Sequence, residues 1–337
     1  VYHNKLGSQL ERVERIQLLS GRIARSIGAD ALLAERAAWL AKADLLTGMV
    51  GEFPELQGTM GRYYALHDGE PAAVAAAIEA HYCPRFSGDR LPEDRVSCAV
   101  ALADRLDSLV GLFGIGAQPT GERDPFALRR AALGVIRILI EMGLELPLDN
   151  LVKWASAGYS GNAKVVAANA EIETFVLERL RGYLLEHGYT ANEVEAVLSQ
   201  RPTRIDLVPR QLEAVRGFSA LPEAGSLAAA NKRIGNILRQ AGSVPADFDA
   251  GLLVQPEERS LAAAYNALLA DVESAFRGLD YTGALRKLAT LKEPVDAFFD
   301  KVMVMDEDAR LRANRIALLG RLHATMNRVA DLSKLAA

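Results

Sequence analysis

Apolar residues recur three or four positions apart through almost the whole sequence, and this spacing constrains the fold more than any other feature. The first run lies within residues 5–27 and contains Leu6, Leu10, Val13, Ile16 and Ile23. Residues at this spacing lie along one side of an α-helix. Similar runs follow, separated by glycine and proline, and no segment shows the sustained alternation that is typical of a half-buried strand. The sequence therefore predicts an all-α protein.

Composition further limits the classes of protein to which the chain can belong. The chain has 337 residues and is 50% hydrophobic, so we expect more than one domain, because single cores stop growing at about 250–300 residues. A net charge of −4 gives no overall attraction to nucleic acid, so any such contact must come from local basic faces. No apolar run approaches the ~18 residues of a membrane span, and no membrane contact is predicted. Cys83 and Cys98 form no metal-binding pair, and as reduced, structural cysteines they fit a cytoplasmic protein.

Three aspartates could in principle form a metal site. Asp104 and Asp107 lie three positions apart on a long buried helix predicted from Glu93 to Phe113, and Asp44 lies in an earlier apolar segment. The five histidines include no pair at the spacing of metal ligands. The alternative is that the carboxylates cap loops or form ion pairs with Lys42, Arg62 and Arg105. The residues favour this second interpretation, and no metal ligand is assigned.

The segment Gly114 to Gly121, GIGAQPTG, is predicted to be an ordered loop. It resembles a phosphate-binding loop only in its glycines, because it lacks the terminal Lys-Ser/Thr and no strand precedes it. Its glycines are expected to supply positive φ angles and close packing. Asp124-Pro125 is predicted to cap and begin the next helix.

Basic residues gather on two predicted helices near the C-terminal end. On the helix at residues 226–241, which Gly242 should end, the candidates are Lys232, Arg233, Asn236 and Arg239. On a final helix from about Glu307 to Leu332, they are Arg310, Asn314, Arg315, Arg321 and Arg328. Arginine, lysine and asparagine on one face suit contacts to phosphates and base edges. A solvated charged face would look the same, so both interpretations remain open.

Long segments of the chain resemble the β subunit of bacterial glycyl-tRNA synthetases. They include KADLLTGMVGEFPELQGTMGRYYALHDGEP, ALADRLDSLVGLFGIGAQPTG, ANKRIGNILRQAG and EPVDAFFDKVMVMDEDARLRANRIALLGRL. The resemblance implies an HD-like helical domain at residues 1–146, a helical linker domain at 147–217 and a helical anticodon-binding-type domain at 218–337. It also implies that the N-terminal half of the family's subunit lies outside this sequence.

HD phosphohydrolases resemble the first domain at the level of fold. They bind metal through a His-Asp pair on one helix and an Asp from a later helix, and the matching positions here are Ala43-Asp44 and Asp104. One ligand histidine is therefore missing, and the first helix lacks another. The site at Asp44 and Asp104 is expected to be degenerate, with no metal and no catalytic residue. An active metal-dependent HD-type phosphohydrolase that uses Asp44 and Asp104 is the rival enzyme hypothesis.

The family resemblance implies a tRNA-binding part of glycine–tRNA ligase that positions tRNA(Gly) for aminoacylation. Glycine and ATP would be activated on a separate α subunit, so this chain would hold no cofactor although the holoenzyme uses ATP. The implied partners are tRNA(Gly) and the α subunit in an α2β2 holoenzyme in the cytoplasm. A non-catalytic helical scaffold, whose basic faces are only solvated, is the remaining alternative.

Overall fold

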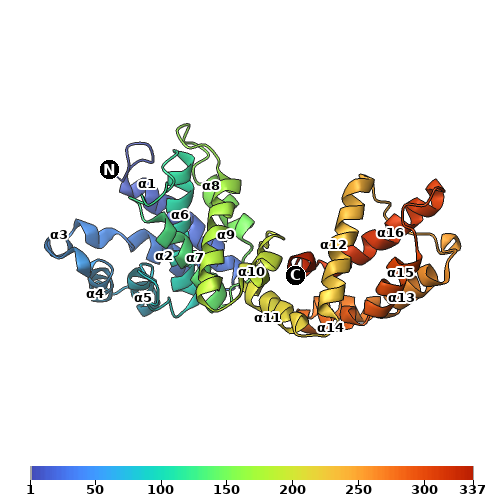
Figure 1. The fold of residues 1–337 in the computed structure, drawn as a ribbon. Helices are drawn as coiled ribbons and strands as arrows, with labels where there is room; N and C mark the ends of the chain where they lie inside the picture. The colour runs from blue at the N-terminus through green and yellow to red at the C-terminus, as the bar shows by residue number, and fades with distance from the viewer. Residues whose placement is uncertain (1, 337) are drawn as a thin grey trace. The chain divides into compact units, whose positions relative to one another are not determined.

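The computed structural model describes residues 2–336, and its regular elements are sixteen α-helices and five short 3₁₀ helices (Figure 1). No β-strand occurs among these residues, so the all-α prediction is confirmed. Within the same range, no helix is long and apolar enough to cross a membrane. The chain divides into two compact units. Unit 1 comprises Val1–Tyr183 with Thr203–Asp206, and unit 2 comprises Leu184–Pro202 with Leu207–Ala337.

Unit 1 is built around one long helix that neighbouring helices cover. Its helices are α1 (Gln9–Ser26), α2 (Ala31–Leu40), α3 (Gly48–Glu52), α4 (Thr59–His67), α5 (Ala72–Ala80), α6 (Arg95–Gly114), α7 (Leu128–Glu141), α8 (Leu148–Ala157) and most of α9 (Asn169–Glu186), with η1 (Ala43–Leu46) and η2 (Pro54–Leu56). Helix α6 packs against α1, α2, α5, α7 and α8. It is apolar on nearly every side, as a helix surrounded by others must be, and the Asp94 side chain caps its start.

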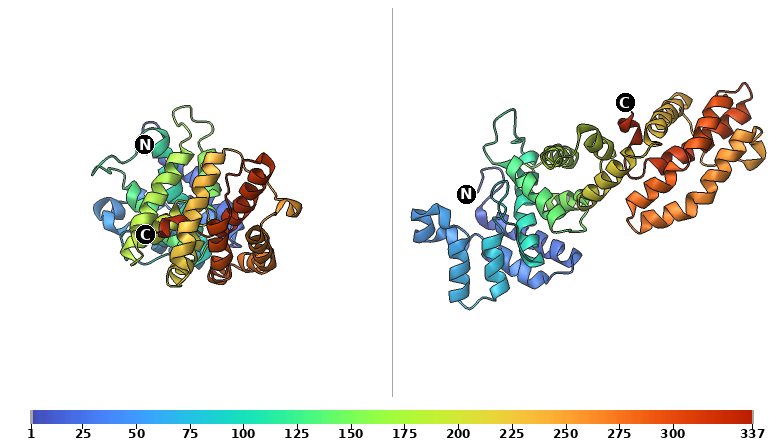
Figure 2. Two further views of the ribbon diagram at one scale, coloured as in Figure 1. Left: turned by 45° about the vertical axis from the view of Figure 1, so that its right-hand side comes forward. Right: turned by 60° about the horizontal axis from the view of Figure 1, so that its bottom comes forward.

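Unit 2 is a second helical assembly. Its elements are α10 (Ala191–Leu198), α11 (Val208–Ser219), α12 (Ala224–Ala241), η4 (Ala250–Leu252), α13 (Pro256–Arg277), α14 (Tyr281–Ala289), α15 (Lys292–Lys301), α16 (Ala309–Met326) and η5 (Leu332–Leu335). Helix α12 packs against α16, α15 and η5, and α13 packs against α14 and α15 (Figures 1 and 2). The remaining 3₁₀ helix, η3 (Ile205–Leu207), lies where the chain passes from one unit to the other.

The predicted boundaries at 146/147 and 217/218 do not coincide with this division. The predicted linker domain, residues 147–217, is shared between the two units. Helix α8 packs against α6 and α1, and this burial of its apolar face makes it part of unit 1. Helices α10 and α11 instead pack against each other, with η5 and α14 as their further neighbours in unit 2. Burial of their apolar faces therefore places α8 in unit 1 and α10 and α11 in unit 2.

Two predicted helix ends differ from the structure. Asp124 does cap the next helix, since its carboxylate accepts hydrogen bonds from the N–H of Leu128 at 2.8 Å and of Arg129 at 2.9 Å. That helix nevertheless begins only at Leu128, because the chain turns at Ala127 with a φ of 54°. Helix α16 ends at Met326, six residues before the predicted Leu332. There the side chain of Asn327 accepts a hydrogen bond from the N–H of Leu332 at 3.0 Å, which stabilises a turn.

The loop after α6 contains the predicted positive φ angles at Gly116 (75°) and Gly121 (52°). Gly114 instead closes α6, where an added Cβ would come within 2.9 Å of the carbonyl oxygen of Val166. The loop thus uses glycine for both conformation and close packing, as expected.

Replacing Gly116 by Val tests the conformational requirement. A β-branched residue at this φ should cost about 1–3 kcal/mol of unfolding free energy, and about 2–4 °C in melting temperature for each kcal/mol. Gly161→Val is the matched control, because Gly161 is also exposed, has no positive φ and has open space beyond its Cα. Thermal unfolding followed by circular dichroism measures both. Equal melting temperatures for the two variants would contradict the requirement for glycine at position 116.

Candidate functional site

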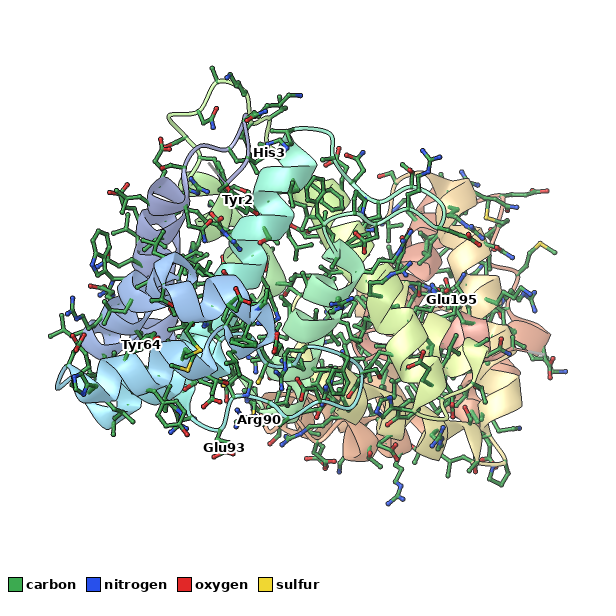
Figure 3. The ribbon with its side chains drawn as sticks, turned by 90° about the vertical axis from the view of Figure 1, so that its left-hand side faces the viewer. Tyr2, His3, Tyr64, Arg90, Glu93 and Glu195 are labelled. Carbon is green, nitrogen blue, oxygen red and sulfur yellow. The ribbon has the colours of Figure 1, made fainter. Side chains whose placement is uncertain are left out.

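The first candidate site centres on Asp104 of α6. Its Oδ1 atom lies 2.9 Å from Nη2 of Arg12, on α1, and 3.2 Å from Nζ of Lys42, between α2 and η1. All three side chains lie in the interior of unit 1. The ring of Tyr2, labelled in Figure 3, covers the guanidinium of Arg12 with 4.4 Å between Cζ and the ring centroid. One carboxylate is therefore enclosed by two cations from other elements.

Burial and charge act in opposite directions on these groups. Burial alone would raise the pKa of Asp104, but the charges of Arg12 and Lys42 outweigh it and hold that pKa well below its usual range. Burial lowers the pKa of Lys42 to about 8, although the neighbouring carboxylate of Asp104 opposes this shift. Asp104 is therefore ionised, and Lys42 is largely protonated at neutral pH.

His81 completes this cluster and was not predicted to belong to it. Its Nε2 lies 2.7 Å from Nζ of Lys42, and its Nδ1 lies 2.5 Å from the carbonyl oxygen of Ile78. A carbonyl only accepts, so Nδ1 carries the proton and Nε2 accepts a hydrogen bond from Lys42. Burial, reinforced by the charge of Lys42, lowers the pKa of His81 to about 3. The imidazole is thus a neutral acceptor for the lysine.

The carboxylate of Asp44 binds other groups than the carboxylate of Asp104 does. Its Oδ2 accepts hydrogen bonds from the backbone N–H of Gly58 at 2.6 Å and of Gly61 at 3.1 Å. The predicted cation partners are correct only for Lys42. Arg105 donates to the backbone carbonyls of His81, Ala101, Tyr82 and Pro84, and Arg62 pairs with Glu79. Arg105 binds backbone carbonyls because its side chain points from α6 to the end of α5. There the carbonyl oxygens lack helical partners.

The third aspartate, Asp107, binds Nε of Arg15 at 2.7 Å. Arg12 also lies 3.6 Å from Asp107 through its Nε, so it links the carboxylates of Asp104 and Asp107, whereas Asp44 is bound by backbone amides. Among residues 2–336, no three His, Cys, Asp or Glu side chains gather in a geometry that could hold a metal ion. Lys42 lies between Asp104 and His81, the two groups of the cluster that could otherwise ligate a cation. This arrangement favours ion pairing over hydrolytic chemistry.

The low pKa of His81 makes the stability of unit 1 depend on pH. The unfolded chain binds a proton at His81 below about pH 6.5, whereas the folded chain binds it only near pH 3. The free energy of unfolding should therefore fall as the pH drops below 6.5, with a contribution of at most about 1.4 kcal/mol per pH unit. His81→Gln keeps an acceptor for Lys42 and should remove this contribution in urea titrations between pH 4 and 6.5.

His67→Gln is the control for this measurement, because His67 is exposed at the end of α4. It should leave the pH dependence of the wild-type chain intact. If His81→Gln and the wild-type chain lost stability with the same slope, His81 would not be the buried neutral group described here.

The second candidate site lies in unit 2, where the structure separates the predicted basic residues. Asn314 and Arg315 were predicted to lie on an exposed face, and this is wrong. Asn314 is 6% exposed, and its side chain exchanges two hydrogen bonds with the backbone of Asp249, at 2.6 and 3.0 Å. Arg315 is 1% exposed and binds the carboxylates of Glu258 and, at 2.6 Å, of Asp306. Both side chains thus connect α16 to other segments of unit 2.

The reason lies in the orientation of α16. The helix buries the face that carries Asn314, Arg315 and Leu318, so two polar residues belong to the core-facing side. Elsewhere on the predicted surfaces, Arg321 pairs with Asp247, Arg328 with Glu273, and Arg233 stacks on Phe299. Arg310 is exposed near the start of α16. These side chains are spread over unit 2 and do not form one surface.

The buried pair of Arg315 and Glu258 can be tested by stability. Arg315→Met leaves the carboxylate of Glu258, which is fully buried, without its cation, and should cost about 3–5 kcal/mol of unfolding free energy. Arg310→Met, on the exposed part of the same helix, should change it by less than about 0.5 kcal/mol. Urea denaturation compares them. An Arg315→Met variant as stable as the wild-type chain would contradict the structural role.

Three of the predicted residues do lie together. Lys232, Asn236 and Arg239 lie along α12 and line a hollow of about 630 Å³. The opposite wall comes from the end of α16 and from η5. It includes His323, Asn327, Asp331, Ser333 and Lys334. None of these residues was predicted, because no local spacing indicates that α16 packs against α12 or that the chain turns at Asn327.

The hollow combines cations with hydrogen-bonding groups. Lys232, Arg239 and Lys334 are exposed at its edge. The Oδ1 of Asn236 accepts a hydrogen bond from Arg239, one helical turn away, so its amide nitrogen remains a donor. Cations beside amide and imidazole groups in one concave surface can bind an anionic ligand that also carries polar edges.

Comparisons with known proteins agree with the sequence resemblance. A family model described as "Glycyl-tRNA synthetase beta subunit" matches residues 1–199, and one described as "DALR anticodon binding domain" matches residues 227–336. The second range contains Lys232, Asn236, Arg239 and the opposite wall of the hollow.

Curated relatives carry the same description. The chain is 59% identical over 340 residues to the "Glycine--tRNA ligase beta subunit" of Thiobacillus denitrificans, 57% identical to that of Dechloromonas aromatica and 56% identical to that of Ralstonia nicotianae. Each alignment covers 100% of this chain and 48% of the relative, so the chain spans about half the length of these relatives. The chain belongs to the glycyl-tRNA synthetase β subunit family.

Proposed function

We propose that this chain is the tRNA-binding part of the β subunit of a glycine–tRNA ligase, and that unit 2 contacts the anticodon arm of tRNA(Gly). The observation that carries the proposal is the hollow on α12. It gathers Lys232, Asn236 and Arg239 inside the segment that matches an anticodon-binding domain. The proposal also accounts for a chain with a net charge of −4, because the cations needed for RNA are placed locally.

In this proposal, some side chains position the RNA and others recognise its bases. Exposed lysine and arginine side chains attract phosphates of any sequence, whereas amide and imidazole groups can distinguish base edges. Anticodon bases are unstacked, so their edges are accessible to such groups. In this proposal, unit 2 holds the anticodon arm, and the bound tRNA is thereby placed with its acceptor end at the aminoacylation centre.

The reaction itself would take place on another chain. We propose that glycine and ATP are activated on the α subunit, that the two subunits form an α2β2 holoenzyme in the cytoplasm, and that this chain holds no cofactor. Unit 1 would retain its helical fold for contact with RNA or with the α subunit. The position of Lys42 between Asp104 and His81 supports this role over phosphoester hydrolysis.

Binding titrations test the proposal. Lys232→Ala and Arg239→Ala should each weaken the binding of tRNA(Gly) and of an anticodon-swapped tRNA(Gly) by a similar factor. Each should also reduce the dependence of log K on log salt by about one unit, since each removes one phosphate contact. Arg286→Ala, an exposed cation on α14, is the control and should leave both quantities at wild-type values.

The titration is made with this chain and with the holoenzyme reconstituted with the α subunit. The proposal requires that both bind tRNA(Gly) at low salt and prefer it to the anticodon-swapped version. If neither bound any tRNA, the scaffold alternative would replace it.

A further inference from the structure

We infer that the hollow between α12, the end of α16 and η5 takes up a single unstacked nucleotide base, and that it prefers a base with an exocyclic amino group. This inference rests on the proposed function and specifies how its site would read RNA. The hollow measures about 630 Å³, within the range of about 300–1,000 Å³ that is usual for pockets that enclose small ligands. A single base fits this space, whereas a stacked helix does not.

The floor of the hollow is fixed before any ligand arrives. Asn231 on α12 is fully buried and exchanges two hydrogen bonds with the side chain of Asn327, at 2.8 and 2.9 Å. The Asn327 amide also donates to the carbonyl oxygen of His323 at 2.8 Å. These hydrogen bonds between side-chain amides therefore join the two walls of the hollow. Such a prearranged floor avoids part of the ordering cost of binding.

Two groups on the α16 side face the ligand with unused hydrogen-bonding capacity. The first is His323, which is half-buried and whose ring nitrogens have no hydrogen-bond partner among the described residues. Burial lowers the pKa of His323, although Asp331 opposes the shift, so the imidazole is neutral and offers one donor and one acceptor.

Asp331 is the second group, and it provides the preference for an amino group. Its Oδ1 accepts hydrogen bonds from the N–H and hydroxyl of Ser333, at 3.0 and 2.6 Å, which leaves Oδ2 without a hydrogen bond from the described residues. A carboxylate can only accept. It therefore pairs with an exocyclic amino group, such as that of cytosine, and is repelled by the carbonyl oxygen that uracil carries at the same ring position.

Gly235 gives the ligand and His323 their space. A Cβ at this position would lie 3.3 Å from Nε2 of His323, so the imidazole packs directly over the backbone of α12. A larger side chain at residue 235 would project into the hollow. Gly225 lies on the same helix and is exposed, and a Cβ added there would meet no atom within 4 Å. The two glycines thus offer a matched pair for a blocking experiment.

The experiment uses fluorescence anisotropy with the whole chain at pH 7.5, with labelled hexacytidylate, hexauridylate and tRNA(Gly) as probes. Cytosine and uracil have the same ring size and differ in the amino group, so the pair isolates the contact to Asp331. We expect hexacytidylate to bind about tenfold or more tightly than hexauridylate, as one charged hydrogen bond implies. Asp331→Asn should abolish this difference, and it keeps a side chain that can cap η5.

Gly235→Leu should weaken hexacytidylate and tRNA(Gly) at least about tenfold, while Gly225→Leu should bind as the wild-type chain does. Thermal unfolding confirms that both variants are folded. Equal binding of the two homopolymers, or equal tRNA(Gly) affinity for the two leucine variants, would overturn the base pocket. Since tRNA(Gly) would still bind in these cases, the proposed function would stand. A wild-type chain and holoenzyme that bound no RNA would overturn both.

Discussion

The carboxylate of Asp104 lies among the helices of unit 1, where an unpaired charge would cost several kcal/mol. Arg12 and Lys42 compensate it, and in doing so they hold α1 and the segment after α2 against α6. Arg315 has the same role in unit 2, where it joins α16 to Glu258 of α13 and to Asp306. In both units, one central charge requires partners from several elements. An arrangement of the helices that separated these partners would leave a buried charge alone and would cost several kcal/mol.

Much of the helical architecture could be predicted from the sequence. The prediction for α6 was correct within two residues, because an apolar run with one capping aspartate depends on local information. The end of α12 at Gly242 was also correct, since Gly242 adopts a positive φ there. The partners of Asp104 were harder to predict. Arg12 lies 92 residues away in the sequence, and which of many cations approaches a buried carboxylate is decided by packing.

The hollow in unit 2 shows the same limit within one surface. Lys232, Asn236 and Arg239 could be predicted, because helical spacing alone places them on one face of α12. His323 and Asp331 could not, since His323 meets α12 only through the packing of α16, and Asp331 only after the chain turns at Asn327. Arg315 was grouped with the other basic residues of the last helix as a candidate for contact with RNA. Its burial depends on the carboxylate of Glu258, more than fifty residues earlier, and no periodicity in α16 reveals it.

The hydrogen bonds from Gly58 and Gly61 to Asp44 have a consequence for motion. Gly58 precedes α4 directly and Gly61 lies in its first turn, and the segment before them, from η1 through α3, exposes Leu46, Met49 and Phe53. An exposed apolar segment with few contacts would normally open often and exchange its amide hydrogens quickly. Here the buried carboxylate of Asp44, in η1, binds the start of α4 and so holds the two ends of this segment together. The amides of Gly58 and Gly61 should therefore exchange at the slow rate of a helix interior, so that this apolar surface is presented by a segment that holds its shape.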